Sequence, residues 1–324
     1  MDLAVIIVNW NVRDLLAACL RSVEADLAAS GLAGQIWVVD NASSDDSVSM
    51  LRRDFPQVKL IACDQNLGFA GGNNAALRAI GFAPSPARGG EHVPEAVLLL
   101  NPDTEVHHGA LKALSDFLKN NPQVGIAGAQ LVYGDGSFQH SGFAFPGVWQ
   151  LAIELLPLPG RLVESRLNGR YPRSAYEGGR PFRVDHPLGA AMCVRREAIQ
   201  SVGLLDERYQ MYVEEIDWSK RMAAAGWPAY CVPAARITHF GGQSTGQVKM
   251  SSFIKLWTSR AQFYRKYYSP LKVGLAAQIV RLGLQRRARQ DAQAASRGEL
   301  SQAELVERLD GYRQIINLWQ GKAG

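Results

Sequence analysis

The segment Asn101-Pro102-Asp103 places a carboxylate directly after the hydrophobic run 97–100. Proline removes a ladder donor and favours an extended conformation at the residue before it, so a strand should stop at Asn101. Ligands of open α/β sheets bind outside the carboxyl ends of strands. We therefore predict Asp103 to be an exposed acid on a turn, where it either holds a divalent cation or caps nearby backbone amides.

Three other polar segments follow hydrophobic runs in the same way. Asn9-Trp10-Asn11 follows residues 3–8, Asp40-Asn41-Ala42-Ser43 follows 35–39, and the segment 66–73 follows 58–63. If these runs are parallel strands, all four ends meet at one edge and form a nucleotide-sized pocket. Asp40 is suited to accept a hydrogen bond from the imide of a pyrimidine base. Glycines 68, 71 and 72 allow close approach of backbone to a ligand, or simply close helix packing.

A second acidic cluster is Glu214-Glu215-Ile216-Asp217. Glu214 and Asp217 are three residues apart and share a helix face, whereas Glu215 points about 100° away. At a helix N-terminus the macrodipole favours ionised carboxylates, which suits a general base. Two simpler roles stay open: the acids cap the helix, and Asp217 forms an i, i+4 pair with Arg221.

His239 is predicted to lie in a glycine-rich loop after a short strand at 230–232. A lone histidine is more often structural than a ligand. However, Asp103 supplies too few ligands for a catalytic metal by itself, and a loop imidazole could complete the set. Both roles of His239 stay open at this point.

The elements that would position these residues alternate between strand and helix. We predict strands at 3–8, 35–39, 58–63 and 96–100 with helices at 14–28, 47–54 and 70–80, and then a helix at 109–120 and a strand at 124–131. Such alternation is typical of a parallel sheet covered by helices. After an irregular region, further elements are predicted at 188–195, 196–202 and 217–225, and the pattern is helical from residue 251 onward.

Composition limits the alternatives. The four cysteines lie far apart without a Cys-x-x-Cys pair, so we expect reduced thiols in a cytoplasmic protein. No secretory signal is expected, and the apolar stretch 271–284 is too short to span a bilayer. The net charge is +5, and residues 251–289 hold nine Lys and Arg residues and no acid. This excess indicates either an anionic partner or a solvated basic face; we expect no nucleic-acid partner.

With these motifs in order, the sequence resembles family 2 glycosyltransferases of the GT-A fold, particularly bacterial rhamnosyltransferase-like members. The resemblance covers about residues 3–268. It rests on the segments 5–11, 39–45, 66–74, 99–103, 189–192, 202–207, 212–218 and 239–244. It implies an α/β, Rossmann-like, mostly parallel mixed sheet flanked by helices. The catalytic domain would be 1–250, with a nucleotide-binding half at about 1–105 and an acceptor half at 106–250, followed by a helical extension at 251–324.

The resemblance also implies roles for individual residues. Asp40 would contact the pyrimidine of a UDP- or dTDP-sugar, Asp103 and His239 would bind Mg²⁺ or Mn²⁺ at the diphosphate, and Glu215 would be the base, with Glu214 and Asp217 as rivals. The other donor-binding residues would be Asn9, Asn11, Asn41, Asn66, Gly68, Asn73 and Asn101. The implied reaction is inverting transfer of a sugar, such as L-rhamnose, to a glycan or polyprenyl-linked glycolipid. The usual Asp-x-Asp reads Asn101-Pro102-Asp103 here, and the usual Glu-Asp reads Glu214-Glu215.

The predicted helix at 251–268 mixes basic and aromatic residues, including Trp257, Arg260, Phe263 and Tyr264. Such a face suits an anionic lipid surface, which would make the protein peripheral on the cytoplasmic membrane face, or it packs on the catalytic core. A homodimer through these helices is also open. Two other functions are alternatives: a catalytically weak scaffold or glycan-binding protein of a polysaccharide assembly complex, and a sugar nucleotidyltransferase. The latter lacks its triphosphate loop after the first strand.

Overall fold

The computed structural model describes residues 1–82, 93–209, 212–241 and 249–321. It divides into two compact units. The first comprises Met1–Phe145, Tyr171–Gln210 and Glu214–Gly246; the second comprises Pro146–Arg170, Met211–Val213 and Gln247–Gly324. The functional division of residues 1–250 into a nucleotide half and an acceptor half stays a prediction.

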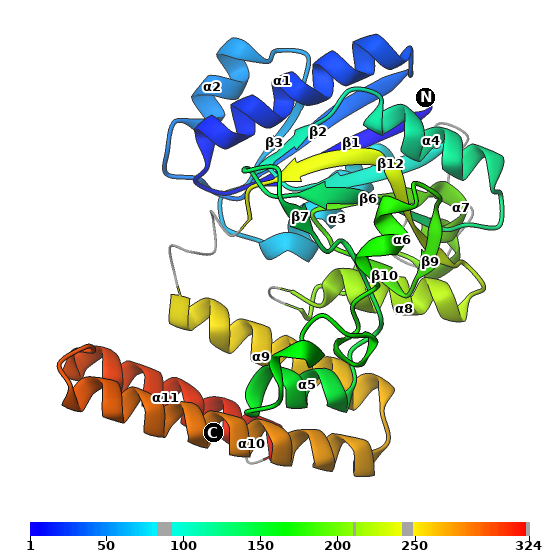
Figure 1. Ribbon diagram of the computed structural model, residues 1–324. Helices are drawn as coiled ribbons and strands as arrows, with labels where there is room; N and C mark the ends of the chain where they lie inside the picture. Colours follow the sequence, from blue (N-terminus) through cyan, green and yellow to red (C-terminus); the bar gives the residue numbers. More distant parts are fainter. Residues whose placement is uncertain (83–92, 210–211, 242–248, 322–324) are drawn as a thin grey trace. The chain divides into compact units, whose positions relative to one another are not determined.

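The first unit is built on a mixed, mostly parallel sheet in the order β3-β2-β1-β4-β11-β6-β12-β5, with β7 paired to β6 and β9 to β12 (Figure 1). Its strands are β1 Leu3–Asn9, β2 Gly34–Asp40, β3 Lys59–Ala62, β4 Ala96–Leu100, β5 Thr104–Val106, β6 Ile126–Val132, β7 Phe138–Gln139, β9 Phe182–Val184, β11 Ala191–Arg195 and β12 Ala229–His239. A separate small pair joins β8 Gly142–Phe143 to β10 His186–Pro187. The fold class inferred from the sequence is confirmed.

Strands β1 to β4 run parallel, as their hydrophobic runs predict. In the register between β1 and β2, Asn9 lies opposite Asp40, and Asp40 in turn lies opposite Ala62 of β3. Strand β4 ends at Leu100, so Pro102 terminates it where the sequence indicated. The carboxyl ends of these four strands therefore share one edge of the sheet, and the polar segments that follow them converge there.

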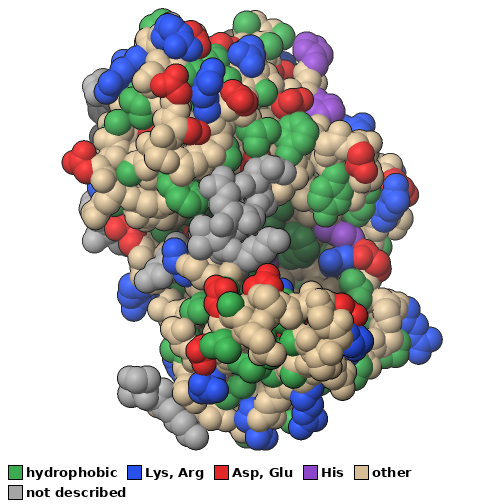
Figure 2. Space-filling model, turned by 90° about the vertical axis from the view of Figure 1, so that its left-hand side faces the viewer, with side chains coloured by type: hydrophobic (Ala, Val, Ile, Leu, Met, Phe, Trp, Pro, Cys, Tyr) green, Lys and Arg blue, Asp and Glu red, His purple; other side chains and the backbone are tan. Residues whose placement is uncertain are grey.

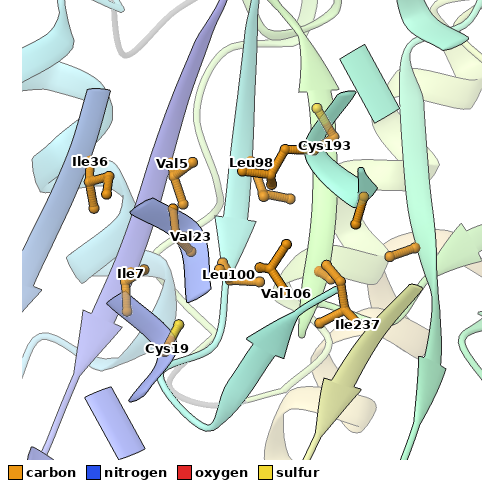
Figure 3. Packing of buried hydrophobic residues seen from close by; sticks show 14 of the residues in the cluster. Val5, Ile7, Cys19, Val23, Ile36, Leu98, Leu100, Val106, Cys193 and Ile237 are labelled. Atoms are coloured by element: carbon orange, nitrogen blue, oxygen red, sulfur yellow. The ribbon is translucent and has the colours of Figure 1, made fainter. Parts of the chain in front are cut away.

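Helices cover both faces of this sheet because its strands alternate their side chains between two cores. The helices of the first unit are α1 Arg13–Ser30, α2 Ser47–Asp54, α3 Gly68–Ile80, α4 Ala110–Asn120, α6 Arg173–Glu177, α7 Arg196–Val202 and α8 Glu214–Ala224. Val5 and Ile7 of β1 join a core with α1, α2 and α4, part of which is shown in Figure 3. Ile6 points to the other face, into a core with α3, α7 and α8. Every residue of β4 is buried, as expected for a strand in the middle of a sheet that helices cover on both faces.

Two strands differ from the sequence prediction. Strand β12 runs for eleven residues, whereas a short strand at 230–232 was predicted. It continues past Pro233 because its register against β6 shifts between Val232 and Arg236, and a bulge accommodates a proline that cannot donate to the ladder. Strand β5, which was not predicted, then pairs antiparallel with the end of β12. His239 is consequently the last residue of a strand, and its predicted place in a loop is wrong.

The second unit is helical. It contains α5 Val148–Leu155, the short 3-10 turns Gly160–Leu162 and Arg166–Asn168, and the long helices α9 Lys249–Tyr267, α10 Pro270–Ser296 and α11 Gln302–Trp319. Trp257, Phe263 and Tyr264 of α9 are fully buried. Trp319 of α11 lies 5.3 Å from the ring of Tyr264 and donates a hydrogen bond to the carbonyl of Trp257. These three aromatic residues of α9 therefore belong to the core of this helical unit.

The cysteines and the lengths of the helices bear on the expectations from composition. All four cysteines are free, and Cys19, Cys193 and Cys231 are buried. Burial raises the pKa of the Cys19 thiol to about 12, so this group is a neutral core side chain. Among the helices that the structure describes, none combines the length and apolarity needed to cross a bilayer.

Candidate active site

The first corner of the site lies where β1 and β2 end. The Asn9 amide donates to the Asp40 carboxylate at 2.9 Å and to the Ser43 hydroxyl at 3.2 Å. Asp40 also accepts from the backbone N–H of Ser43 at 2.9 Å. Asn9 and Asp40 are both essentially unexposed. Hydrogen bonds fix the orientation of this carboxylate, although no cation stands against it within these contacts.

Asn11 and Ala42 shape the loops around this corner. Both have positive φ values, 53° and 59°, in the left-handed region that non-glycine residues seldom adopt. The Asn11 side-chain oxygen accepts from the backbone N–H of Ser44 at 2.7 Å, and the Asn11 backbone N–H donates to the Ser43 hydroxyl at 3.0 Å. Asn11 thus ties the loop after β1 to the loop after β2. Ser43, which belongs to the predicted polar segment 40–43 but was given no individual role, joins Asn9, Asn11 and Asp40.

Asn41 links the same corner to the start of α3. Its amide nitrogen donates to the carbonyl of Gly68 at 3.0 Å. Gly72 is needed here because a Cβ at this position would lie 2.8 Å from Val8 and 3.4 Å from the Asn41 amide. Asn66 accepts from the Gly68 N–H at 2.8 Å and shapes the turn that begins the helix. The asparagines and glycines of this motif therefore bring α3 close to the ends of β1 and β2.

Two buried amide oxygens at this corner lack a donor. Asn9 Oδ1 and Asn41 Oδ1 are inaccessible to solvent, and no hydrogen-bond donor reaches either among the residues that the structure describes. A buried carbonyl without a partner costs about 1–3 kcal/mol, so such groups call for an explanation. A ligand that supplies N–H or O–H donors would satisfy both.

The two neighbouring asparagines of α3 have different contacts. Asn73 donates to the carbonyl of Phe69 within its own helix at 2.9 Å. Asn74 instead crosses to the segment after α7, where it donates to the carbonyl of Leu205 and accepts from the Leu205 N–H. Its amide also donates to Glu207 at 2.8 Å. Asn74 therefore holds two parts of the scaffold together, and a donor-binding role of Asn73 stays a prediction.

The second corner contains Asp103 after β4. Asp103 Oδ1 lies 3.5 Å from Nε2 of His239, and the Asn101 amide nitrogen lies 3.4 Å from the same ring atom. On the other side of the ring, Nδ1 lies 3.3 Å from Oε1 of Gln139. An amide oxygen can only accept, so this contact places a proton on Nδ1; in the neutral imidazole the Nε2 lone pair then faces Asp103.

Long-range pairing builds this second corner. His239 lies opposite Thr104 in the β12–β5 ladder, and the Phe240 N–H donates to the Asp103 carbonyl at 2.9 Å. This pairing covers the turn, so that Asp103 is only 5% exposed and His239 only 8% exposed. The prediction of an exposed acid at position 103 is therefore wrong. Within the described residues, no three His, Cys, Asp or Glu side chains gather into a cluster that could hold a metal alone.

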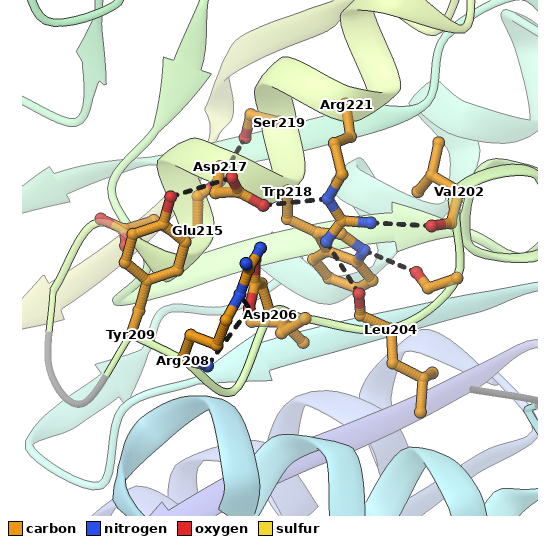
Figure 4. A network of polar contacts seen from close by, with 12 residues as sticks. Val202, Leu204, Asp206, Arg208, Tyr209, Glu215, Asp217, Trp218, Ser219 and Arg221 are labelled. Atoms are coloured by element: carbon orange, nitrogen blue, oxygen red, sulfur yellow. Dashed lines mark hydrogen bonds and ion pairs between the residues drawn. The ribbon is translucent and has the colours of Figure 1, made fainter. Parts of the chain in front are cut away.

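The acids of α8 divide into scaffold and surface groups (Figure 4). Asp217 is completely buried; it accepts from Arg221 Nε at 2.9 Å and from the Tyr209 hydroxyl at 3.1 Å. Arg221 also donates to the carbonyls of Val202 and Leu204 at 2.7 Å each. The predicted i, i+4 pair is confirmed. Its contacts show Asp217 joining α8 to the segment after α7.

Glu215 points away from this network, as helical spacing predicts. Its Cγ would lie 3.3 Å from a Cβ at Gly189, so the side chain rests directly on that glycine. The neighbouring Ala190 accepts a hydrogen bond from the Asn101 N–H at 2.9 Å. Gly189 and Ala190 thus connect Glu215 to the corner that holds Asp103. Glu215 is partly exposed, whereas Glu214 is 3% exposed.

The backbone before α8 is strained. Tyr212 and Val213 have φ values of 63° and 73°. A left-handed conformation is a genuine outlier for a β-branched residue such as Val213. Strain of this kind costs about 1–3 kcal/mol per residue and clusters at functional sites. The strained pair stands directly before the acids Glu214 and Glu215.

Three aromatic rings of the first unit, those of Phe143, His186 and Phe145, form a stack. The His186 ring stacks between Phe143 and Phe145, with centroid distances of 5.7 and 6.1 Å. The ammonium of Lys220, on α8, lies 4.4 Å from the centroid of the Phe145 ring. Burial lowers the pKa of His186 to about 4, so its imidazole is neutral at physiological pH. This histidine, like Gln139 beside His239, had no sequence motif that marked it.

Comparison with known proteins decides the family. Residues 4–199 match the family model described as glycosyl transferase family 2. The chain belongs to this family. It is therefore a glycosyltransferase. The four polar segments at the strand ends lie within the matched region, whereas the acids of α8 and His239 follow it.

Two curated relatives are similar over about two thirds of the chain. The N-acetylglucosaminyl-diphospho-decaprenol L-rhamnosyltransferase of Mycobacterium tuberculosis is 29% identical over 237 residues, covering 69% of this chain and 74% of the relative. The low-salt glycan biosynthesis hexosyltransferase Agl10 of Haloferax volcanii is 28% identical over 221 residues, covering 68% of this chain and 61% of the relative.

Solved structures of glycosyltransferases share the fold. The mannosyltransferase PcManGT of Pyrobaculum calidifontis, in complex with GDP-Man and Mn²⁺, superposes with a TM-score of 0.54 at 18% identity and covers 99% of this chain and 86% of that one. GalNAc-T7 with UDP, GalNAc and Mn²⁺ gives a TM-score of 0.52 at 18% identity, over 74% of this chain and 43% of that one. At this level of identity the likeness concerns the fold alone.

Proposed function

We propose that this glycosyltransferase uses a divalent metal, Mg²⁺ or Mn²⁺, to transfer a sugar from a UDP- or dTDP-sugar to a hydroxyl of a lipid-linked glycan, with inversion. The observation that carries the proposal is the convergence of Asp103, His239 and Asn101 at the end of β4, connected through Gly189 to Glu215. Sugar transfer with a nucleoside diphosphate leaving group needs charge stabilisation at the diphosphate and a base at the acceptor.

The residues at the β4 corner fit a divalent metal. Asp103 Oδ1 and His239 Nε2 are 3.5 Å apart, which is compatible with two ligands of one ion at about 2.1 Å each. Gln139 on Nδ1 orients the imidazole, as the outer partner of a metal-bound histidine does. Only two ionisable side chains are present, so most coordination positions stay available for diphosphate oxygens and water. A bound Mg²⁺ or Mn²⁺ would offset the negative charge that develops on the leaving diphosphate.

The corner of β1 and β2 would bind the nucleotide. Its polar groups are already oriented by the fold, and the oxygens of Asn9 and Asn41 lack donors. A pyrimidine imide and the ribose hydroxyls provide N–H and O–H donors that suit such acceptors and Asp40. Asn11 would act through the loop that it fixes, and Asn66 and Gly68 through the turn that begins α3.

Glu215 is the proposed base. Asp217 is committed to Arg221 and Tyr209, so its carboxylate serves the scaffold. Glu214 is buried on the same helix face. Glu215 is the acid of α8 that is partly exposed, and it stands beside the residues that pair with Asn101. It would accept the proton of the acceptor hydroxyl as that oxygen attacks the anomeric carbon from the side opposite the diphosphate.

The names of the relatives support the donor and the acceptor. The similar Mycobacterium tuberculosis protein is named as an L-rhamnosyltransferase acting on a decaprenyl-diphosphate-linked sugar. We therefore propose L-rhamnose as the sugar and a polyprenyl-diphosphate-linked glycan as the acceptor. A peripheral place on the cytoplasmic membrane face would follow from such an acceptor. A homodimer stays a prediction.

The test is release of nucleoside diphosphate from a panel of UDP- and dTDP-sugars, with Mg²⁺, Mn²⁺ or chelator, in the presence of a polyprenyl-diphosphate-linked acceptor. We expect metal-dependent release and a product of inverted anomeric configuration by NMR. Glu215→Gln should lower transfer by about 10²–10⁴-fold, as expected for removal of a general base, and should leave donor binding unchanged.

Glu197→Gln is the matched control, because Glu197 is also an acid in the first turn of a helix, α7. It should transfer at the wild-type rate. Retention of full activity by Glu215→Gln would exclude Glu215 as the base. Failure of every nucleotide-sugar, with or without metal, would contradict the proposed reaction and favour a non-catalytic, glycan-binding role.

A further inference from the structure

Helix α10 carries large apolar side chains on its solvent side. Leu271 is 87% exposed, Leu275 53% and Leu282 50%. These three leucines are spaced by four and seven residues, so they lie within about 40° of one another around the helix axis. Exposed apolar side chains that share one helix face mark interaction surfaces more often than scattered single ones do, and here the exposed Gln278 lies between Leu275 and Leu282 on that face. We call them the leucine stripe.

Packing within the helical unit fixes the direction of the stripe. Ala276, Val280 and Leu284 of α10 are buried and lie on the opposite side of the helix. At Gly283 the helix lies so close to α5 that a Cβ there would stand 2.4 Å from the Cβ of Leu155. The helix therefore cannot turn its leucines inward without losing this close contact. The exposed stripe is a property of how α10 packs in its own unit.

Cations accompany the leucines. Acidic and basic side chains are interspersed on the face of the molecule shown in Figure 2, but α10 is different. Between residues 270 and 290 it holds five basic residues and no acid; they are Lys272, Arg281, Arg286, Arg287 and Arg289. Arg286 and Arg289 are exposed, and by helical spacing they continue the leucine stripe into the second half of the helix.

Helix α5, beside the start of α10, adds an exposed tryptophan. The Tyr268 hydroxyl donates to the carbonyl of Pro146, which places the start of α5 beside the start of α10. Trp149 in the first turn of α5 is 61% exposed. Lys272 lies over the Tyr268 ring at 3.5 Å. Tryptophan, leucine and flanking cations are the side chains of helices that lie in a membrane interface.

We propose that the leucine stripe of α10, with its flanking cations, docks on an anionic phospholipid bilayer. This inference rests on the proposed function, because an enzyme with a polyprenyl-linked acceptor must bind that acceptor at a membrane surface. A second copy of the chain is the less suitable occupant. A symmetric dimer would place the same patch against itself and would bring its cations together without acids to pair them. Trp257, Phe263 and Tyr264 of α9, for which the sequence suggested this role, are buried and cannot serve it.

The test is co-sedimentation of the full chain with vesicles of phosphatidylcholine alone or of phosphatidylcholine mixed with phosphatidylglycerol. We expect binding to the anionic vesicles that weakens as salt is raised. The double variant Leu275→Asp/Leu282→Asp should bind more than about tenfold less well, because two apolar contacts are replaced by carboxylates that the anionic surface repels. The affinity of Arg286→Glu/Arg289→Glu for anionic vesicles should fall at least roughly fivefold for each cation removed.

Val306→Asp on α11 is the matched control, because Val306 is 56% exposed but lies outside the stripe; it should bind as the wild type does. The proposal is overturned if the wild type ignores anionic vesicles or if both double variants bind normally. It is also overturned if equilibrium sedimentation finds a dimer that Leu275→Asp/Leu282→Asp dissociates. The rise in melting temperature with nucleoside diphosphate, measured on the same samples, tests the proposed function separately.

Discussion

Two buried polar networks of the first unit differ in how completely their groups are satisfied. Around Asp217, the carboxylate and the guanidinium of Arg221 have partners on several sides, and the network joins α8 to the segment after α7. At the ends of β1 and β2, the amide oxygens of Asn9 and Asn41 are equally buried but have no donor within the described residues. The chain completes one network by itself and leaves the other incomplete.

This difference separates scaffold from ligand site. Buried polar groups are nearly always paired, because an unpaired one costs free energy without return. A network that is complete without a ligand gains nothing from binding one, whereas an incomplete network regains its lost hydrogen bonds when donors arrive. We therefore propose that Asp217 belongs to the scaffold and that the strand-end asparagines recognise a ligand, although both occur in motifs of similar polarity.

The largest expected effect concerns the complete network. Arg221→Met leaves the buried carboxylate of Asp217 without its cation, and leaves the carbonyls of Val202 and Leu204 without a donor. We expect a loss of about 3–5 kcal/mol in the free energy of unfolding, measured by urea denaturation. Arg208→Met is the control, because its pair with Asp206 is exposed on the arginine side; it should change stability by less than about 0.5 kcal/mol. Equal effects of the two variants would contradict the assignment.

Protonation of His186 would place a positive charge in the buried scaffold of the first unit. Burial holds the pKa of this imidazole at about 4, below its unfolded value of about 6.5. The unfolded chain therefore binds the proton first, and stability present above about pH 6.5 is lost as the pH falls toward 4. At pH 5 the loss should be about 2 kcal/mol. Urea denaturation at pH 7 and pH 5 should show this loss in the wild type but not in His186→Gln; a parallel loss in both proteins would exclude His186 as its source.

The incomplete network predicts the opposite pattern of effects. Asn41→Ala removes one hydrogen bond to Gly68 together with an unpaired buried oxygen, so stability should change by about 1 kcal/mol or less. Nucleoside diphosphate affinity, measured by calorimetry, should fall about tenfold. Asn121→Ala is the matched control, because the Asn121 amide also donates to a nearby carbonyl, that of Phe117, but lies at the end of α4. Loss of stability without loss of affinity would mean that Asn41 belongs to the scaffold.

The elements that sequence predicts well are those whose signal is local. Residues 96–100 form β4 as predicted, because a continuous apolar run before Asn101-Pro102 leaves few alternatives. Helix α2 also has its predicted bounds, 47–54. The convergence of four strand ends followed from the alternation of strands and helices, since parallel strands share one carboxyl edge.

The features that sequence missed depend on distant partners. Pro233 suggested that a strand ended, and nothing local indicated that β12 continues through a bulge to His239. The burial of Asp103 depends on that continuation, because His239 pairs beside it across more than a hundred residues. The same holds for α9, whose basic and aromatic pattern predicted a surface or a packed helix equally well, until Trp319 was seen against Trp257 and Tyr264.

The central claim is that Asp103 and His239 hold the divalent metal that links the protein to the diphosphate of its donor. The most direct measurement is calorimetric titration of UDP and dTDP into the wild type and Asp103→Asn, with Mn²⁺ and with chelator. The account predicts that Mn²⁺ strengthens binding of one of these nucleotides to the wild type by about tenfold or more, and that Asp103→Asn keeps the metal-free affinity but loses the increment. If Mn²⁺ strengthens nucleotide binding to Asp103→Asn as much as it does for the wild type, the metal role of Asp103 is contradicted.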